Sequence, residues 1–297
     1  MAIGYEGYIR LKLDGTANWE TLLGTGGSVP QARQRLESQS GYGGRIKTPV
    51  DEIGIGFPEN YDWTAWDGSL SFELHKNALD NQIVPWIFDR QSHAQVYLVS
   101  RGSNVQQFDY CYWNSINLSA GDGAAVEGSV GFVGMERDSY TIGGDYIGNK
   151  NNNILETANY PAPLNVSDAN DTPIPFWDTT VTIESTEYEF TTWSLDFSQD
   201  VTKFFECGRT SAGADPGVQE PKYVAVGPMS VVFQGDYMFV TTASFAIPDT
   251  LTTLYVNIGG TDVKLETLEL TSATDAVQNG SAITPIGVEY FAYEIAA

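Results

Sequence analysis

The sequence predicts a mainly β fold built as two similar units in tandem, and an internal repeat is the main observation behind this prediction. Residues 254–294 contain three apolar runs of strand length separated by two turns with glycine, and residues 95–135 show the same succession. The offset between corresponding residues is constant at 158, in the pairs Gly102 and Gly260, Val105 and Val263, Phe132 and Tyr290, and Gly134 and Ala292. A duplication of one β unit explains this constant offset.

The elements of the first unit, residues 1–140, follow from their residue periods. Residues 8–13 alternate apolar and polar side chains, which is typical of a half-buried strand, and residues 68–74 do the same. Residues 77–90 change to a helical period, with apolar positions at Leu79, Ile83, Trp86 and Ile87. We expect Asn77 to cap this short helix and Pro85 to shorten or kink it.

Residues 15–48 are rich in glycine, serine, threonine and glutamine, and we expect a long loop there. This segment holds the densest group of basic residues in the chain, Arg33, Arg35, Arg45 and Lys47. We predict that it docks on the acidic surface of an adjacent subunit, since attraction between exposed charges acts only over about 8 Å at physiological salt. The alternative is a solvated loop without a role. Deletion of residues 20–45 is expected to leave a folded subunit.

The second unit, residues 179–297, follows a linker over residues 141–178 that repeated glycine, asparagine and proline residues interrupt. Residues 193–198 alternate like residues 8–13, and residues 229–234 align with residues 68–73 at an offset of 161. Residues 237–247 take the place of the short helix, although Val240, Thr241 and Thr242 form helices poorly. Each unit is therefore expected to contain a strand, a long loop, a strand, a short helix and three closing strands.

The charge balance argues against a protein that grips nucleic acid. The net charge is −23, with 18 acidic and 11 basic residues in residues 1–150 and 20 acidic and 4 basic residues in residues 151–297. A protein that neutralises phosphates needs a basic surface, and the sequence shows none. A solvated acidic surface is the plain alternative. The sequence also contains no apolar run of membrane-helix length, so no membrane contact is expected.

Motifs for catalysis or cofactor binding do not stand out, and we expect a protein that is not an enzyme and holds no cofactor or metal. His75 and His93 are expected to be satisfied or exposed histidines rather than ligands. Cys111 and Cys207 are expected to be packed thiols. The tryptophans are expected in the core or at an interface, and a carboxylate pair for glycoside cleavage stays open among the 38 acidic residues.

The layout resembles the major tail tube proteins of long-tailed bacteriophages, in the fused variant with two domains. The features that carry the resemblance are the opening strand at residues 8–14, the passage over residues 68–99, the segment at residues 193–201, and the closing hairpin and strand in both halves. The resemblance implies that each unit is a small β-sandwich or barrel with a short flanking α-helix. It also implies a structural protein of the virion, which assembles in the host cytoplasm.

In that family, rings of six domains stack into a hollow tube through which the genome leaves the capsid. A fused chain would form a homotrimer with a pseudo-hexameric ring, and the partners implied are further copies, a tape measure protein, and tail terminator and distal tail proteins. DNA would pass through the lumen without specific binding. Two alternatives remain open: a baseplate hub or distal-tail ring built from the same domain, and a carbohydrate-binding β-sandwich or glycoside hydrolase.

Overall fold

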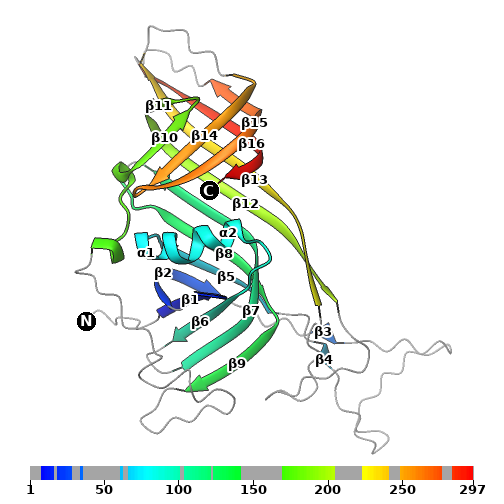
Figure 1. The fold of residues 1–297 in the computed structure, drawn as a ribbon. Coiled ribbons are helices and arrows are strands. Elements are labelled where there is room, and N and C mark those ends of the chain that lie inside the picture. Colours follow the sequence, from blue (N-terminus) through cyan, green and yellow to red (C-terminus); the bar gives the residue numbers. More distant parts are fainter. Residues whose placement is uncertain are drawn as a thin grey trace, which may run out of the picture.

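The computed structural model confirms the mainly β prediction and describes residues 8–16, 19–28, 34–35, 61–62, 66–100, 104–121, 123–141, 169–204, 223–240, 248–275 and 283–296. A single antiparallel sheet of 14 strands dominates this part of the chain (Figure 1). A short helical segment lies beside the sheet, and a separate two-stranded sheet completes the described structure.

The first half supplies nine strands and the helical segment. Its elements are β1 (Tyr8–Leu13), β2 (Glu20–Ser28), β3 (Gln34–Arg35), β4 (Tyr61–Asp62), β5 (Trp66–Glu73), α1 (Lys76–Ala78), the π-helical turn η2 (Leu79–Ile83), α2 (Val84–Phe88), β6 (Ala94–Ser100), β7 (Asn104–Gly121), β8 (Glu127–Gly134) and β9 (Glu136–Thr141).

The second half contains strands and two single helical turns. Its elements are η3 (Ala169–Asp171), η4 (Phe176–Asp178), β10 (Thr179–Ile183), β11 (Thr186–Tyr188), β12 (Phe190–Phe204), β13 (Tyr223–Val240), β14 (Thr250–Ile258), β15 (Thr261–Asp275) and β16 (Ile283–Ala296).

The same succession of strand pairings occurs in both halves. In the first half, β1 pairs with β2, β2 with β5, β5 with β8, β8 with β7, β7 with β6, and β6 with β1. In the second half, β10 pairs with β11, which leads through Glu189 into β12, and the succession continues through β13, β16, β15 and β14 back to β10. The strand order expected from an internal duplication is therefore present.

Two of the bulges occur at equivalent places in both halves, whereas the bulge between Ala94 and Val96 has no counterpart in β14 and β15. A bulge leaves Thr25 of β2 and Thr191 of β12 without a partner at equivalent places, 166 residues apart. A second bulge leaves Asn114 of β7 and Thr271 of β15 without a directly opposed residue in the neighbouring strand, 157 residues apart. Bulges are retained features of related β structures, so these coincidences support a common origin of the two halves.

Positive φ angles and strand registers refine the alignment of the halves. Tyr110 of β7 and Thr267 of β15 have φ angles of 52° and 53°, again at an offset of 157. Phe72 of β5 and Tyr237 of β13 occupy equivalent positions, so the offset between these strands is 165. The predicted offset of 161 is wrong by four residues, because a shift by an even number preserves the alternation on which the alignment was based.

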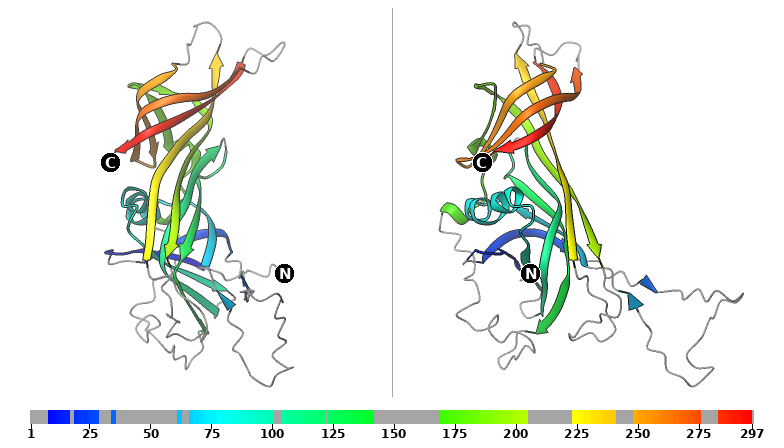
Figure 2. Two further views of the ribbon diagram at one scale, coloured as in Figure 1. Left: turned by 90° about the vertical axis from the view of Figure 1, so that its right-hand side faces the viewer. Right: turned by 45° about the vertical axis from the view of Figure 1, so that its right-hand side comes forward.

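The two halves join through β7 and β12. Residues 115–121 of β7 pair with residues 192–198 of β12 in antiparallel register, so the strands of both halves belong to one sheet. Figure 2 shows β12 and β13, in yellow-green and yellow, running from the upper group of strands down alongside the green strands of the first half. On the inner side of the junction, Ile116 and Leu118 are buried with Leu195 and Phe197.

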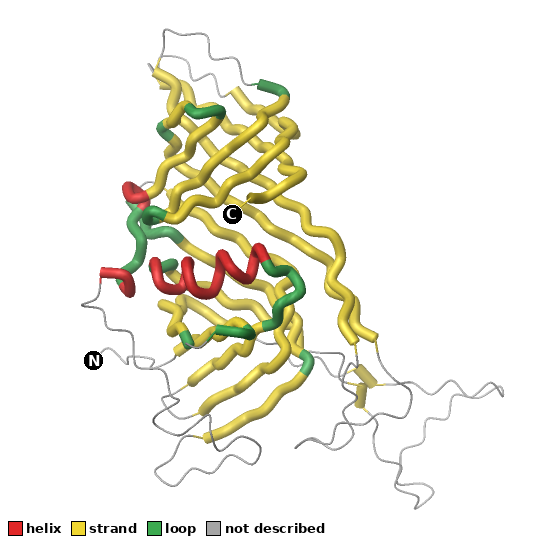
Figure 3. Tube along the Cα trace, in the orientation of Figure 1, coloured by secondary structure: helices red, strands yellow, loops and turns green. Residues whose placement is uncertain are grey.

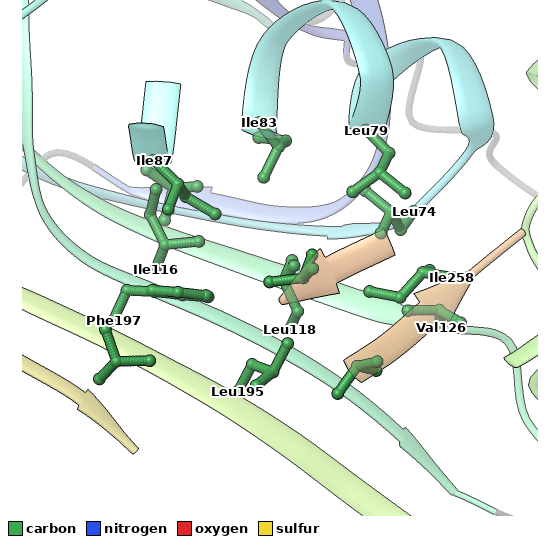
Figure 4. Packing of buried hydrophobic residues seen from close by; sticks show 14 of the residues in the cluster. Leu74, Leu79, Ile83, Ile87, Ile116, Leu118, Val126, Leu195, Phe197 and Ile258 are labelled. Atoms are coloured by element: carbon green, nitrogen blue, oxygen red, sulfur yellow. The ribbon is translucent and has the colours of Figure 1, made fainter. Parts of the chain in front are cut away.

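The helical segment packs over this junction rather than over one half alone. Figure 3 shows the helices, in red, on one side of the strands. Figure 4 shows side chains of the helical segment above residues of both halves, with Leu79, Ile83 and Ile87 facing Ile116, Leu118, Leu195, Phe197 and Ile258. Burial of one large apolar side chain stabilises a fold by about 1.5–3 kcal/mol, so this cluster fixes the two halves against each other.

The start of the helix differs from the prediction. His75, not Asn77, is the N-cap, and its Nδ1 accepts a hydrogen bond of 3.2 Å from the backbone N–H of Ala78. The helix continues through Pro85 without ending, because the preceding turn, Leu79–Ile83, is a π-helix. A π-helical turn changes the hydrogen-bonding register, so the missing N–H of proline is tolerated there.

The prediction of a loop over residues 15–48 is wrong for residues 20–28, which form β2. The glycines that suggested a loop allow close packing of side chains against the strand. A Cβ added to Gly24 would lie 2.5 Å from Cδ1 of Ile9, and one added to Gly27 would lie 3.2 Å from Cδ2 of Leu98. Because Leu22 of the same strand is buried in the core, deletion of residues 20–45 would unfold the subunit rather than leave it intact.

The end of the predicted linker is structured as well. Ile174 is buried, its N–H donates to the carbonyl of Leu74 at 2.8 Å, and its own carbonyl accepts from Val126 at 2.8 Å. Lys76 of the helix donates to the carbonyl of Gly259 in the β14–β15 turn at 2.9 Å. The N–H of Gly259 also donates to the carbonyl of Asp178 at 2.9 Å. Residues 169–178 therefore form a strap that contacts both halves.

A second flanking helix is not found in the described part of the second half. Residues 237–240, the start of the segment expected to replace it, belong to β13 instead. Residues 241–247 lie outside the described residues. The β-branched residue Val240 favours the strand, because such side chains lose rotamer freedom in a helix.

The close packing of β5 against β8 gives a first prediction. A Cβ added to Gly128 would lie 2.4 Å from Cε2 of the buried Phe72, whereas one added to Gly121 would lie 3.8 Å from its nearest neighbour, Cγ2 of Thr192. We expect Gly128→Ala to lower the free energy of unfolding by about 1–3 kcal/mol and the control Gly121→Ala to change it by less than about 0.5 kcal/mol. Urea denaturation measures both values, and equal effects would contradict the packing described.

A second prediction concerns alkaline pH. Burial raises the pKa of Tyr290, whose hydroxyl donates to the carbonyl of Pro248 at 3.1 Å, from 10.0 to about 12. Between these values the folded protein keeps a proton that the unfolded chain has released, so stability falls as pH rises through this window. We expect melting temperatures of the Tyr290→Phe variant to decrease less steeply between pH 10 and pH 12 than those of the unchanged protein. Parallel curves would contradict this assignment.

Candidate functional site

The most extensive functional candidate is the outer surface of the shared sheet. Side chains of β12 alternate between the core and this surface, since Trp193 and Leu195 are buried whereas Thr192, Ser194 and Asp196 are not. We call this surface the polar face and define it by three rows of paired residues. The rows are Ser71, Ser129, Asn117, Asp196, Val232 and Phe291; Glu73, Glu127, Ser119, Ser194, Gln234 and Glu289; and Gly121, Thr192, Asp236 and Gly287.

Most residues of the polar face are small, hydroxylated, amide or acidic, and only Val232 and Phe291, at the end of the first row, are large and apolar. Its rows contain the carboxylates of Glu73, Glu127, Asp196, Asp236 and Glu289 and no lysine, arginine or histidine. Each row crosses from strands of the first half to strands of the second half at the β7–β12 pairing. The face is therefore a product of the junction and exists in neither half alone.

Asp196 lies at the junction and is held by neutral donors. Nδ2 of Asn117, from the other half, donates to its Oδ1 at 2.5 Å, and Oγ of Ser194 donates to its Oδ2 at 3.3 Å. Hydrogen bonds to a charged group contribute about 1.5–3 kcal/mol. They orient the carboxylate without adding a positive charge, so its negative charge is retained at the surface.

Two further carboxylates of the polar face have the same kind of partners. Glu289 accepts from Nε2 of Gln234 at 2.7 Å and from Oγ1 of Thr271 at 2.6 Å. Asp236 accepts from Oγ1 of Thr192 at 3.1 Å. The neighbouring strands thus position the acidic groups through amides and hydroxyls, which leaves the face negative.

A shallow groove of about 530 Å³ crosses the polar face where β7, β12, β13 and β16 lie side by side. Small residues such as Gly121, Ala124 and Gly287 form much of its lining, and Glu127, Asp236 and Glu289 add negative charge. No group of three or more potential metal ligands occurs among the described residues. The groove is therefore open, lined largely by small residues, and negative.

The histidines have structural surroundings. His75 is buried and satisfied, as predicted: Nδ1 accepts from Ala78, so Nε2 carries the proton and donates to the carbonyl of Thr21 at 2.9 Å. His93 lies at the surface with its Nδ1 3.5 Å from Oδ2 of Asp14. Neither histidine lines the groove, so the arrangement needed for a histidine base beside a bound substrate is not formed there.

Burial raises the pKa of Glu20, although a hydrogen bond of 3.1 Å from Nδ2 of Asn81 opposes this effect. It bears on the alternative of glycoside cleavage, which needs one carboxyl group with a raised pKa beside a second carboxyl group. Asp171 acts on Glu20 electrostatically, but Nδ2 of Asn77 binds Asp171 at 2.7 Å. Neither carboxyl lines the groove. Their asparagine partners, Asn81 and Asn77, belong to the helical segment, so these two hydrogen bonds connect that segment with β2 and with residues 169–171.

The predictions for cysteine and tryptophan are largely met. Cys111 is a packed thiol, and burial raises its pKa well above the ordinary value. Trp86, Trp113 and Trp193 are buried. Cys207 and Trp63 lie outside the described residues. Trp177, in the turn η4, is 75% exposed and therefore does not belong to the core.

The four basic residues predicted to make contacts lie almost entirely outside the described structure. Arg33, Arg45 and Lys47 fall there, and only the strand position of Arg35, opposite Tyr61 in the β3–β4 pair, is described. Docking of this segment stays a prediction.

A two-stranded arm is a second surface feature, which the sequence did not indicate. Beyond the β7 pairing, β12 continues with β13 alone, as far as the pair Phe204 and Tyr223. These side chains are 49% and 61% exposed. Lys203 of the arm binds Asp67 of β5 at 3.2 Å, which ties the arm to the first half. Exposed aromatic residues at the end of a defined strand pair are typical of contact surfaces between proteins.

Comparisons with known proteins identify no family. The sequence matches no protein-family model, and a search of the curated proteins found no relative. Within the described residues, no helix is both long and apolar enough to cross a membrane.

The electrostatics of the polar face generate a prediction about nucleic acid. Replacement of Asp196, Asp236 and Glu289 by lysine would convert the face into a phosphate-binding surface, whereas the unchanged face should not retain duplex DNA. The control replaces three exposed acids outside it, Glu187, Glu189 and Asp249, and so has the same net charge. We expect DNA binding near 50 mM salt only for the first variant, with affinity that decreases steeply as salt increases. Binding by the unchanged protein or equally by both variants, in gel-shift assays, would contradict this view.

Proposed function

We propose that the protein is a structural subunit of a bacteriophage tail tube and not an enzyme. Three copies would form a pseudo-hexameric ring, and stacked rings would enclose a lumen through which DNA passes. The observation that carries this proposal is the continuous sheet made by the β7–β12 pairing, with one face in the core and the other polar. A sheet with one face buried in the core and the other face polar suits the wall of a hollow assembly, because the polar face can line a water-filled lumen.

The repeated pairings support two tail-tube-like domains, residues 1–140 and 179–297. The two halves have equivalent successions of strand pairings, although β11 and β12 follow each other along the chain rather than pair, and the helical segment flanks the first half. The strap at residues 169–178 shortens the proposed linker. Two similar domains in one chain carry two similar contact surfaces. A ring of three chains would therefore contain six such surfaces.

The polar face would line the lumen. Its hydroxyl groups are wetted readily, and its uncompensated carboxylates repel phosphate over roughly a Debye length, about 8 Å at physiological salt. A passing genome would meet no phosphate-neutralising contact. This property favours transport without specific binding.

Contacts beyond one ring would use other parts of the chain. The arm, with Phe204 and Tyr223 exposed, is suited to packing against a further subunit. The basic residues Arg33, Arg35, Arg45 and Lys47 would complement the acidic surface of a neighbour. The other partners proposed are the tape measure protein and the terminator and distal tail proteins of the virion.

Electron microscopy of the purified protein tests the proposal. We expect hollow tubes whose rings have threefold symmetry of whole chains and a sixfold repeat of domains. A replacement of both Phe204 and Tyr223 by serine should reduce tube formation while melting temperature stays within a few degrees. Discrete rings that do not stack would favour a baseplate hub or distal-tail ring, and a monomer with affinity for oligosaccharides would favour the carbohydrate-binding alternative.

A further inference from the structure

The two-stranded sheet of β3 and β4 is the counterpart of the arm of β12 and β13. The offset between the halves is 166 for β2 and β12 and 165 for β5 and β13. Applied to the pair Arg35 and Tyr61 of β3 and β4, these offsets give residues 201 and 226, and Val201 does lie opposite Val226 in the arm. Both halves therefore carry a two-stranded arm, and we call that of β3 and β4 the small arm.

The arm of β12 and β13 lies across the outer face of the first half. Nε2 of Gln199 donates to the carbonyl of Trp113 in β7 at 2.7 Å, and Nζ of Lys203 binds Oδ1 of Asp67 in β5 at 3.2 Å. β8 lies between β7 and β5, so β12 crosses β8 between these two contacts. Val201 lies midway between Gln199 and Lys203 and on the same side of the strand.

This crossing accounts for the burial of an apolar residue that faces outward. Val133 of β8 lies opposite Asp67 and shares the outward side of its strand with Ser129. Val133 is nevertheless only 4% exposed. The path of β12 places Val201 above it, so two apolar side chains meet where the arm covers the first half.

The corresponding surface of the second half is aromatic and more exposed. Phe291 of β16 is the counterpart of Val133, at an offset of 158. The ring of Phe291 lies 5.0 Å, between centroids, from that of Tyr293, which is 60% exposed. The hydroxyl of Tyr293 donates to Oε2 of Glu269 at 2.8 Å. An aromatic pair beside a carboxylate is therefore presented at the place where the first half is covered by an arm.

We propose that the small arm of one copy crosses this surface on a second copy, with Arg35 above Phe291. Within the chain, Val201 and Val133 have the same relation. The proposal deepens the proposed function, on which it rests for the assembly of copies into a ring. Figure 1 shows β3 and β4 far from β15 and β16 of their own chain, so the surface receives the small arm of a different copy. The contact is heterologous, and its repetition leads to a closed ring or to a filament.

The chemistry of the two partners is complementary. A guanidinium group stacks on aromatic rings and forms paired hydrogen bonds with carboxylates. Phe291 and Tyr293 supply the rings, and Glu269 supplies the carboxylate. The change from valine in the arm of β12 and β13 to Arg35 in the small arm thus accompanies a change from an apolar surface to an aromatic and acidic one.

Cross-linking tests the proposal. The test protein carries Arg35→Cys and Tyr293→Cys, with Cys207→Ser to remove the other reactive thiol, since Cys111 is buried. The control carries Arg35→Cys and Glu187→Cys in the same background, because β11 ends the sheet away from β16. With a flexible bis-maleimide, we expect more than half of the test protein to form covalent multimers linked between residues 35 and 293, and less than a tenth of the control.

An exchange of charges gives a second measurement without new cysteines. Arg35→Glu and Glu269→Arg should each weaken the association of copies by at least about tenfold, because like charges then meet. The variant with both replacements should recover most of the association, since the two residues act as a pair. The control with Arg35→Glu and Glu187→Arg has the same net charge and should not recover it. Sedimentation equilibrium measures all four proteins.

Each outcome bears on a different statement. Cross-linked multimers together with tubes support both the arm contact and the proposed function. Tubes without links between residues 35 and 293 would overturn the arm contact and leave the proposed function intact. Cross-linked copies that never form tubes would support the arm contact and contradict the proposed function. Links confined to single chains would overturn the arm contact, and a monomer at high concentration without links would overturn both.

Discussion

The antiparallel pairing of β7 with β12 is the interaction on which the rest of the structure depends. It converts two repeats into one sheet, brings apolar residues of both repeats together beneath the helix, and aligns the rows of the polar face. Because side chains alternate along a strand, a slip of one residue at this pairing would move the core residues of the slipped strand to the surface. Buried Leu195 and Phe197 against Leu118 and Ile116 make such a slip costly.

Sequence patterns predicted the parts of the fold that are local. The closing strands of both halves follow from their apolar runs, and the helix over Leu79, Ile83 and Ile87 follows from its period. The strand β2 could not be predicted in the same way, because the glycines that allow Ile9 and Leu98 to approach closely also suggest a loop. The cap at His75 was missed because its role depends on the tertiary contact with Thr21.

The sequence allowed only the general chemical character of the candidate site to be predicted, not which residues it brings together. An acidic composition and alternating polar residues indicated a negative sheet surface, but no sequence signal indicated that Asn117 would reach Asp196 across the two halves. Two distant strands can pair only where their other partner strands have ended. The ends of those strands are determined by residues throughout the chain and not by the pairing strands alone. For the same reason the arm of β12 and β13 became visible only once the end of the β7 pairing was known.

The separation of β7 from β12 along the chain also affects synthesis. Gly121 leaves the ribosome 71 residues before Thr192, its partner at the junction. At about 5–20 residues per second, the second half of β7 waits roughly 4–15 s for its neighbour. During this interval a nascent chain on one ribosome presents a bare strand edge to the chains beside it on the same message. Efficient production of the protein therefore depends on how quickly the second half is translated, and rare codons between residues 121 and 192 would favour misassembly.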